Sequence, residues 1–107
     1  MINQCMNLSL RPVRRDEVAV VEDFGDYVVI FNSLTAETIG FNRSGLEIWK
    51  EIDGKKTLGD ISDVIAKRFF INRDIAAVDV LNLIGRLHRR MFVFIKGNDN
   101  FSLDHWK

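Results

Sequence analysis

The sequence predicts an α+β fold, in which a three-stranded antiparallel sheet is followed by three helices. Two observations lead to this prediction. The stretch from Glu17 to Phe41 is rich in β-branched and aromatic residues and is interrupted by two turn signals. From Asn42 onward, apolar residues recur at the spacing of an amphipathic helix. The chain has 107 residues, which is enough for one domain with one core.

Three strands are expected in the first half of the chain, at Val18–Val21, Tyr27–Phe31 and Glu37–Phe41. Turn signals around Gly25 and Ala36 separate them. The middle strand is apolar on both faces, which is typical of a central strand. The last strand carries fewer apolar residues, so we expect it at the edge of the sheet.

Start and stop signals define the three helices. Asn42 is a suitable N-cap for the first helix, and Gly54 is expected at its C′ position. Thr57 and Asp60 resemble a capping box at the start of the second helix. Asn72 is the expected cap of a third helix, which continues to about residue 90 and is followed by a short extended segment, MFVFI.

The third helix has an apolar arc that is wider than one neighbouring element normally covers. The arc contains Leu83, Ala76, Leu87, Val80, Met91, Ile84, Ala77 and Leu81. Either this is simply the most buried helix of a small core, or one margin of the arc faces a groove for a ligand. In the second interpretation, Leu83, beside Arg86, lies at the exposed margin.

Both ends of the chain are expected to be flexible tails, at residues 1–12 and 96–107, around a domain at 13–95. The first dozen residues show no sustained period and end at the only proline, Pro12. The last dozen mix Gly, Asn and Asp with isolated aromatics. Phe101 and Trp106 are candidates for docking onto a surface.

The composition argues against several functional classes. Lys plus Arg and Asp plus Glu each total 15, and a dedicated nucleic-acid binder usually carries an excess of positive charge. No apolar run approaches the roughly 20 residues that span a bilayer. Cys5 has no cysteine partner, and His88 and His105 are not at ligand spacing, so we expect no metal and no cofactor. With no secretory signal at the start of the chain, a cytoplasmic protein is expected.

Catalytic chemistry has no support in the sequence. There is no glycine-rich phosphate loop, and no nucleophile is paired with a base and a residue that orients it. We therefore expect a protein that binds rather than an enzyme.

The segments FNRSGLEIWKEIDGKKTLGDI and DVLNLIGRL carry a family resemblance. Their order and spacing resemble the PqqD family, peptide chaperones of pyrroloquinoline quinone biosynthesis, and the related precursor-peptide recognition elements of ribosomal peptide natural products. The resemblance covers about Arg14 to Ile95. There are two departures from the family pattern: Arg43 replaces the helix-start proline, and the glycine expected after the third helix is missing from RRMFVFI.

This resemblance implies a winged-helix-like fold and a function. In the family, the leader of a precursor peptide adds as a strand to the third strand of the sheet, and its side chains enter the groove beside the third helix. The peptide-binding residues that this implies are Glu37, Thr38, Ile39, Gly40, Phe41, Val80, Leu83, Arg86, Leu87 and Arg90. The implied partners are the precursor peptide and a modifying enzyme, such as a radical SAM protein.

The sequence is also compatible with two alternative functions. Three helices and a small sheet also describe winged-helix DNA-binding proteins, in which Arg86, Arg89 and Arg90 could contact phosphates. A dimerisation or interaction module is a third possibility. Arg86 and Arg90 could equally be solvated cations at the C-terminal end of a helix.

Overall fold

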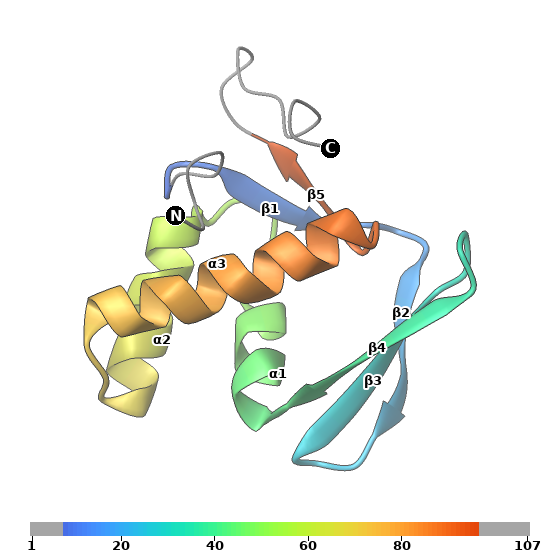
Figure 1. Cartoon of the computed structure of the whole chain (residues 1–107), viewed down its shortest axis with the longest axis horizontal. Helices are drawn as coiled ribbons and strands as arrows, with labels where there is room; N and C mark the ends of the chain where they lie inside the picture. The colour runs from blue at the N-terminus through green and yellow to red at the C-terminus, as the bar shows by residue number, and fades with distance from the viewer. Residues whose placement is uncertain (1–7, 97–107) are drawn as a thin grey trace.

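A computed structural model describes residues 8–96 of the chain and contains two antiparallel sheets and three helices. The elements in chain order are β1 (Arg11–Arg14), β2 (Val18–Asp23), β3 (Tyr27–Asn32), β4 (Glu37–Asn42), α1 (Arg43–Lys50), α2 (Leu58–Phe69), α3 (Arg73–Arg89) and β5 (Val93–Lys96). One sheet has the order β2-β3-β4, and the other pairs β1 with β5. The larger sheet lies on one side of the helices, and the β1–β5 ribbon lies next to the C-terminal part of α3 (Figure 1).

The predicted α+β fold is confirmed, and the predicted strands are extended by one or two residues. β3 is the central strand and β4 is an edge, as expected. The N-caps are also confirmed: the side chain of Asn42 accepts a hydrogen bond from the Gly45 N–H, and Asn72 caps α3. Thr57 and Asp60 form the expected capping box at the start of α2.

The expected role of Gly54 is wrong. Helix α1 ends at Lys50 and has Glu51 as its C-cap, so Gly54 lies beyond the helix terminus. Its positive φ of 79° serves the turn between α1 and α2. Gly54 is therefore a left-handed turn residue, and the helix ends earlier in the chain than this glycine indicated.

The prediction of a flexible tail at 1–12 is wrong for residues 8–12. Leu10 is 1% exposed, and its carbonyl accepts a hydrogen bond from the Leu58 N–H at 2.8 Å. The next residues form β1, which pairs with β5 from Arg11↔Lys96 onward. This pairing joins segments from opposite ends of the described chain, so local periodicity does not reveal it. Lys96 is likewise in a strand, and the other tail residues, 1–7 and 97–107, lie outside the described part of the chain.

The core lies between the larger sheet and the helices. Inward-facing residues of β3 and β4, such as Ile30 and Phe41, pack against α1 and α3. The ring centroids of Phe41 and Trp49 are 5.8 Å apart, so the buried Trp49 packs α1 onto the sheet. Burial of these large side chains provides most of the driving force for this arrangement.

An ionic cluster fixes α2 against α1. Arg68 donates to Glu47 at 2.6 Å and to Glu51 at 3.1 Å. Burial tends to raise the pKa of the Glu47 carboxyl, but the hydrogen bond from Arg68 and the charge of Lys50 outweigh it and lower that pKa. A charged, nearly buried Glu47 therefore holds the two helices in a fixed orientation.

Candidate functional site

A surface groove of about 710 Å³ runs between β4, the first turn of α1 and the exposed side of α3. Its lining residues are Tyr27, Gly40, Phe41, Asn42, Ser44, Gly45, Ile48, Asp79, Asn82, Leu83, Arg86 and Arg89. These elements come together where β4 ends and α1 begins, with α3 crossing nearby (Figure 1). The groove therefore has a strand edge on one side and a helix on the other.

The strand side of the groove depends on a glycine. The Tyr27 ring from β3 leans across Gly40, and a Cβ built at Gly40 would lie 2.0 Å from the Tyr27 hydroxyl oxygen. The tyrosine is 46% exposed, so its ring remains accessible from solvent. Because Gly40 has no side chain, an aromatic ring can lie close to the backbone of the edge strand.

The helix side of the groove combines one apolar and several polar side chains. Leu83 is half-buried and packs against the core at its margin, as predicted. Asp79, Asn82, Arg86 and Arg89 are exposed around it. Within residues 8–96, Asp79 forms no salt bridge with Arg86, so both charged groups are available to a ligand.

The backbone of β4 has a free edge, because β3 pairs with it on the other side only. The Thr38 carbonyl accepts a hydrogen bond from Arg90, the C-cap of α3, at 3.5 Å, so it points away from β3. Successive residues of an antiparallel strand direct their N–H and C=O groups to opposite sides. Thr38, Gly40 and Asn42 therefore present backbone groups to the free edge, whereas Ile39 and Phe41 direct theirs to β3.

The structure brings only some of the predicted site residues to the groove. Gly40, Phe41, Leu83 and Arg86 line it. Glu37, Thr38 and Arg90 lie together beyond one end of it, where Arg90 donates to Glu37 at 3.1 Å. The side chain of Ile39 is buried in the core.

Val80 and Leu87 need a correction. Both side chains are 0% exposed and belong to the core, so they do not form a surface for a ligand in this fold. The wide arc of α3 has a simpler cause, because α3 packs against both α2 and β5. Only the Leu83 margin of the arc reaches the groove.

Several lining residues were missed by sequence reasoning, above all Tyr27 and Asn82. Tyr27 is the only tyrosine of the chain, and it starts the central strand opposite Asn42. The Tyr27 ring reaches the edge strand β4 because of the register between β3 and β4, and patterns in a single sequence do not define that register. Asn82 follows from the helical position of Leu83, since both lie on the uncovered side of α3.

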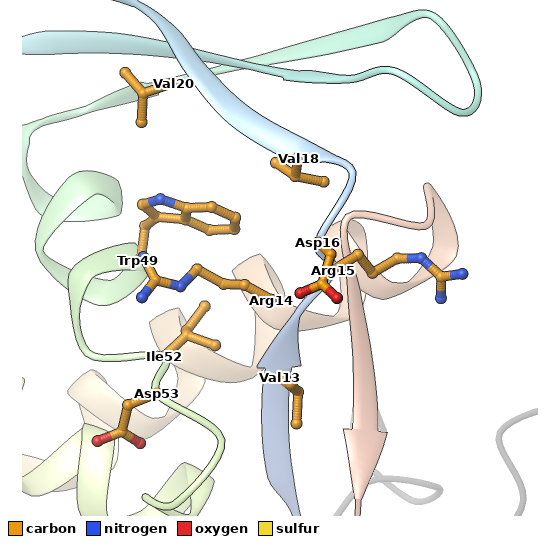
Figure 2. Close-up of a pocket in the computed structure, with 9 residues that line it drawn as sticks. All are labelled: Val13, Arg14, Arg15, Asp16, Val18, Val20, Trp49, Ile52 and Asp53. Carbon is orange, nitrogen blue, oxygen red and sulfur yellow. The ribbon is translucent and has the colours of Figure 1, made fainter.

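A second hollow, of about 470 Å³, lies on the other side of α1, next to β2. Figure 2 shows its lining, with the Trp49 ring and Ile52 on one side and Val18 and Val20 of β2 on the other. The Arg14 guanidinium lies 5.4 Å from the centroid of the Trp49 ring, within cation–π range.

The acidic groups of the second hollow include Asp53, whose carboxylate is already in use. Asp53 accepts hydrogen bonds from the Lys56 and Lys55 N–H groups, and these hold its pKa well below the usual range. This carboxylate organises the turn after α1, so it is not available to bind a ligand in the hollow.

Within residues 8–96, no group of three or more His, Cys, Asp or Glu residues is arranged to hold a metal ion. No helix in this part of the chain is both long and apolar enough to cross a membrane.

Three solved structures share the fold. TbiB1 in complex with the TbiA(beta) leader peptide has 19% identity and a TM-score of 0.68, covering 84% of this chain and 98% of that one. Lasso peptide synthetase B1 complexed with the leader peptide has 18% identity and a TM-score of 0.65, with coverages of 80% and 98%. The PqqD truncation of Methylobacterium extorquens PqqCD, described as a stand-alone recognition element for ribosomally synthesised and post-translationally modified peptides, has 17% identity and a TM-score of 0.65, with coverages of 78% and 87%.

Sequence comparison gives the family. No curated protein matches the chain. Well over half of the chain, residues 27–93, matches the family described as coenzyme PQQ synthesis protein D. The matched residues include the whole of β3, β4 and the three helices. The resemblance noted from the sequence is thereby confirmed, and the chain belongs to the PqqD family.

Proposed function

We propose that this chain is a non-catalytic recognition domain that binds the leader of a ribosomally made precursor peptide by strand addition to β4. The observation that carries this proposal is the free edge of β4 beside a groove with an apolar centre. An unpaired edge offers backbone hydrogen bonds to any extended peptide, and neighbouring pockets read its side chains. Two proteins with the same fold have been solved in complex with a leader peptide, which supports a leader peptide as the ligand.

In this proposal the peptide runs antiparallel to β4 and pairs with outward-facing groups such as those of Gly40. Its apolar side chains cover Leu83 and contact the ring of Tyr27. Arg86 and Arg89 flank this contact and favour a peptide with acidic residues, because charge complementarity steers association.

In this proposal the domain binds the leader but does not catalyse the modification, so a modifying enzyme must act together with it. A radical SAM maturase is the partner that we propose, on the strength of the family. In this role the domain holds the leader while the enzyme acts on the rest of the precursor. Homodimer formation is an alternative use of the same free edge, and the test below separates the two.

DNA binding is the less favoured function. The N-terminal half of α3 exposes Ile75, Val78 and the acidic Asp79, and none of these side chains can donate a hydrogen bond to a phosphate. The balanced net charge points in the same direction.

An amide-shift titration tests the proposal. Random twelve-residue peptides displayed on phage are selected against the immobilised whole chain, and the enriched peptide is synthesised. Added to nitrogen-15-labelled chain, it should shift the amides of β4 and of α3 around Leu83, while those of β2 hardly move. Shifts confined to β2, or produced by a DNA duplex and not by any peptide, would contradict the proposal. Concentration-dependent β4 shifts without peptide would indicate a homodimer instead.

A further inference from the structure

The Arg90 side chain closes one end of the free β4 edge. Its Nε donates to Glu37 Oε1 at 3.1 Å, and its Nη2 donates to the Thr38 carbonyl oxygen at 3.5 Å. That carbonyl is one of the outward groups that an added strand needs for pairing. In the free protein it is therefore already occupied by a group from α3.

A buried asparagine holds Arg90 in this position. Asn32 is fully buried, and its Nδ2 donates to the Met91 carbonyl oxygen at 2.6 Å. The Oδ1 of the same side chain accepts from the Leu34 and Thr35 N–H groups, at 2.8 and 3.3 Å. This one side chain ties the β3–β4 turn to the residue that follows Arg90, so the C-terminal end of α3 is held beside the start of β4.

The groove does not extend as far as this point. Arg86 and Arg89 line it, whereas Arg90 does not. Figure 1 shows α3 nearer to β4 at its C-terminal end, and the two elements diverge toward the start of α1. The space for a peptide is thus open beside Gly40 and Asn42 and closed at Thr38.

A strand edge by itself does not define where a peptide binds along it. Side chains alternate with a period of two, so a peptide that slides by two residues keeps the same side chains facing the groove. Some feature must therefore select one register. A side chain that occupies a pairing group at one end of the edge does so by blocking the shifted alternatives.

We infer that Arg90 is an end stop, a positioning residue that sets the register of the peptide bound to β4. This inference rests on the proposed function. The peptide strand pairs at Gly40 and Asn42 and stops short of Thr38, with Glu37 holding the guanidinium in place. Because the peptide is antiparallel to β4, its residues C-terminal to the bound strand leave the domain at Arg90, so the stop also sets which residue of the precursor emerges there.

Amide exchange in the peptide complex tests the inference, with the phage-selected peptide above as the probe. In the wild-type chain we expect hydrogen–deuterium exchange at Gly40 to slow at least tenfold on peptide addition, while exchange at Thr38 is unchanged. In Arg90→Ala, the slow region should extend to Thr38. A spin label at the peptide C-terminus should then broaden two alternative sets of β4 resonances, because a second register becomes available.

Arg89→Ala is the matched control. Like Arg90→Ala, it removes one positive charge from the C-terminal end of α3. Arg89 lines the groove, but it does not contact Thr38, so the hydrogen bond from Arg90 to Thr38 stays in place. We expect weaker peptide binding in this variant and no extension of the slow region. Thermal melting of each variant confirms that it is folded.

The outcomes separate the end stop from the proposed function. If the peptide slows exchange at Thr38 in the wild-type chain, or if the peptide still binds in a single register to Arg90→Ala, Arg90 is not an end stop, although strand addition to β4 holds. If the peptide binds without any effect on β4 amides, the proposed function is wrong and the end stop fails with it.

Discussion

The two edges of the larger sheet differ in regularity. On one side, β4 pairs with β3 over six consecutive residues, Glu37–Asn42, without a break. On the other side, β2 has a register shift between Val20 and Glu22, which leaves Val21 as an extra residue. Bulges twist an edge strand and interrupt its regular row of hydrogen-bonding groups, so they protect it from pairing.

The edges also differ in charge and in what flanks them. The β2 edge carries the acidic residues Glu17, Glu22 and Asp23 at or beside the strand. The β4 edge is flanked by Arg86 and Arg89 of α3. Val20 and Val21 are each 50% exposed, so β2 does not lack apolar surface. The comparison teaches that exposed apolar residues on an edge are not sufficient for a binding site. A regular backbone and a helix that completes a groove are also required.

The same substitution on the two sides should give the largest contrast. Leu83→Asp places a charge at the centre of the groove, where bound peptide would remove water from it. A desolvation cost of roughly 3 kcal/mol corresponds to about a hundredfold loss of affinity. Val20→Asp, at the exposed edge of β2, should leave affinity within about twofold. Isothermal titration with the selected peptide measures both, and circular dichroism checks that both variants are folded. Equal losses would remove the distinction between the edges.

Local signals explain why most of the fold was predictable from the sequence. The caps at Asn42, Thr57 and Asn72 are interactions between residues at most three positions apart, so the sequence itself contains both partners. The strands were recognised from β-branched and aromatic composition in the same way. These features do not depend on the rest of the chain.

Long-range contacts explain the errors. The β1–β5 pair and the burial of Leu10 depend on segments at opposite ends of the chain. The burial of Val80 and Leu87 depends on how α2 and β5 cover α3, which a helical wheel does not contain. The sequence therefore indicated the two elements that border the groove, but not which side chains of those elements are accessible.

The missing family glycine has a structural counterpart. Met91 follows the C-cap of α3 and has a φ of 68°, a left-handed conformation that glycine adopts without cost. The hydrogen bond from Asn32 to the Met91 carbonyl oxygen helps to fix this conformation. A residue other than glycine therefore has a left-handed conformation here, next to a buried contact from β3.

Gly40→Val should weaken peptide binding by about tenfold, or about 1.4 kcal/mol. The added side chain would occupy the space of the Tyr27 hydroxyl and push the ring off the β4 edge. If this is the mechanism, the effect should be smaller when Tyr27 is replaced by Ala in the same chain. A double-mutant cycle of binding free energies measures this coupling. Fully additive losses would mean that Gly40 acts through the backbone and not through Tyr27.

Arg86→Glu should weaken binding of an acidic peptide by about threefold to tenfold, with a slower association rate and a reduced dependence on salt. Charges at the rim of an interface act mainly through steering, which salt screens. Lys67→Glu is the control, because it makes the same charge change on an exposed residue of α2, away from the groove. Stopped-flow association rates at two salt concentrations distinguish the variants. An equal effect of both would indicate that only the net charge matters.

The smallest effect is expected from removing the protection of the β2 edge. Deletion of Val21 takes out the bulge residue and leaves Val20 and Glu22 opposite Ile30 and Val29, in the register that they already have. Combined with Glu22→Thr, it should produce a regular and less acidic edge that pairs weakly with a second copy, because unprotected edges associate. We expect a dimer with a dissociation constant on the order of 0.1–1 mM, corresponding to roughly 4–5.5 kcal/mol. Sedimentation velocity at increasing concentration measures this association, with Glu22→Thr alone as the control for the charge change. The affinity for the selected peptide should not change, because that peptide pairs with β4. A loss of peptide binding in the dimer would mean that β2 takes part in recognition and that the two edges are not independent.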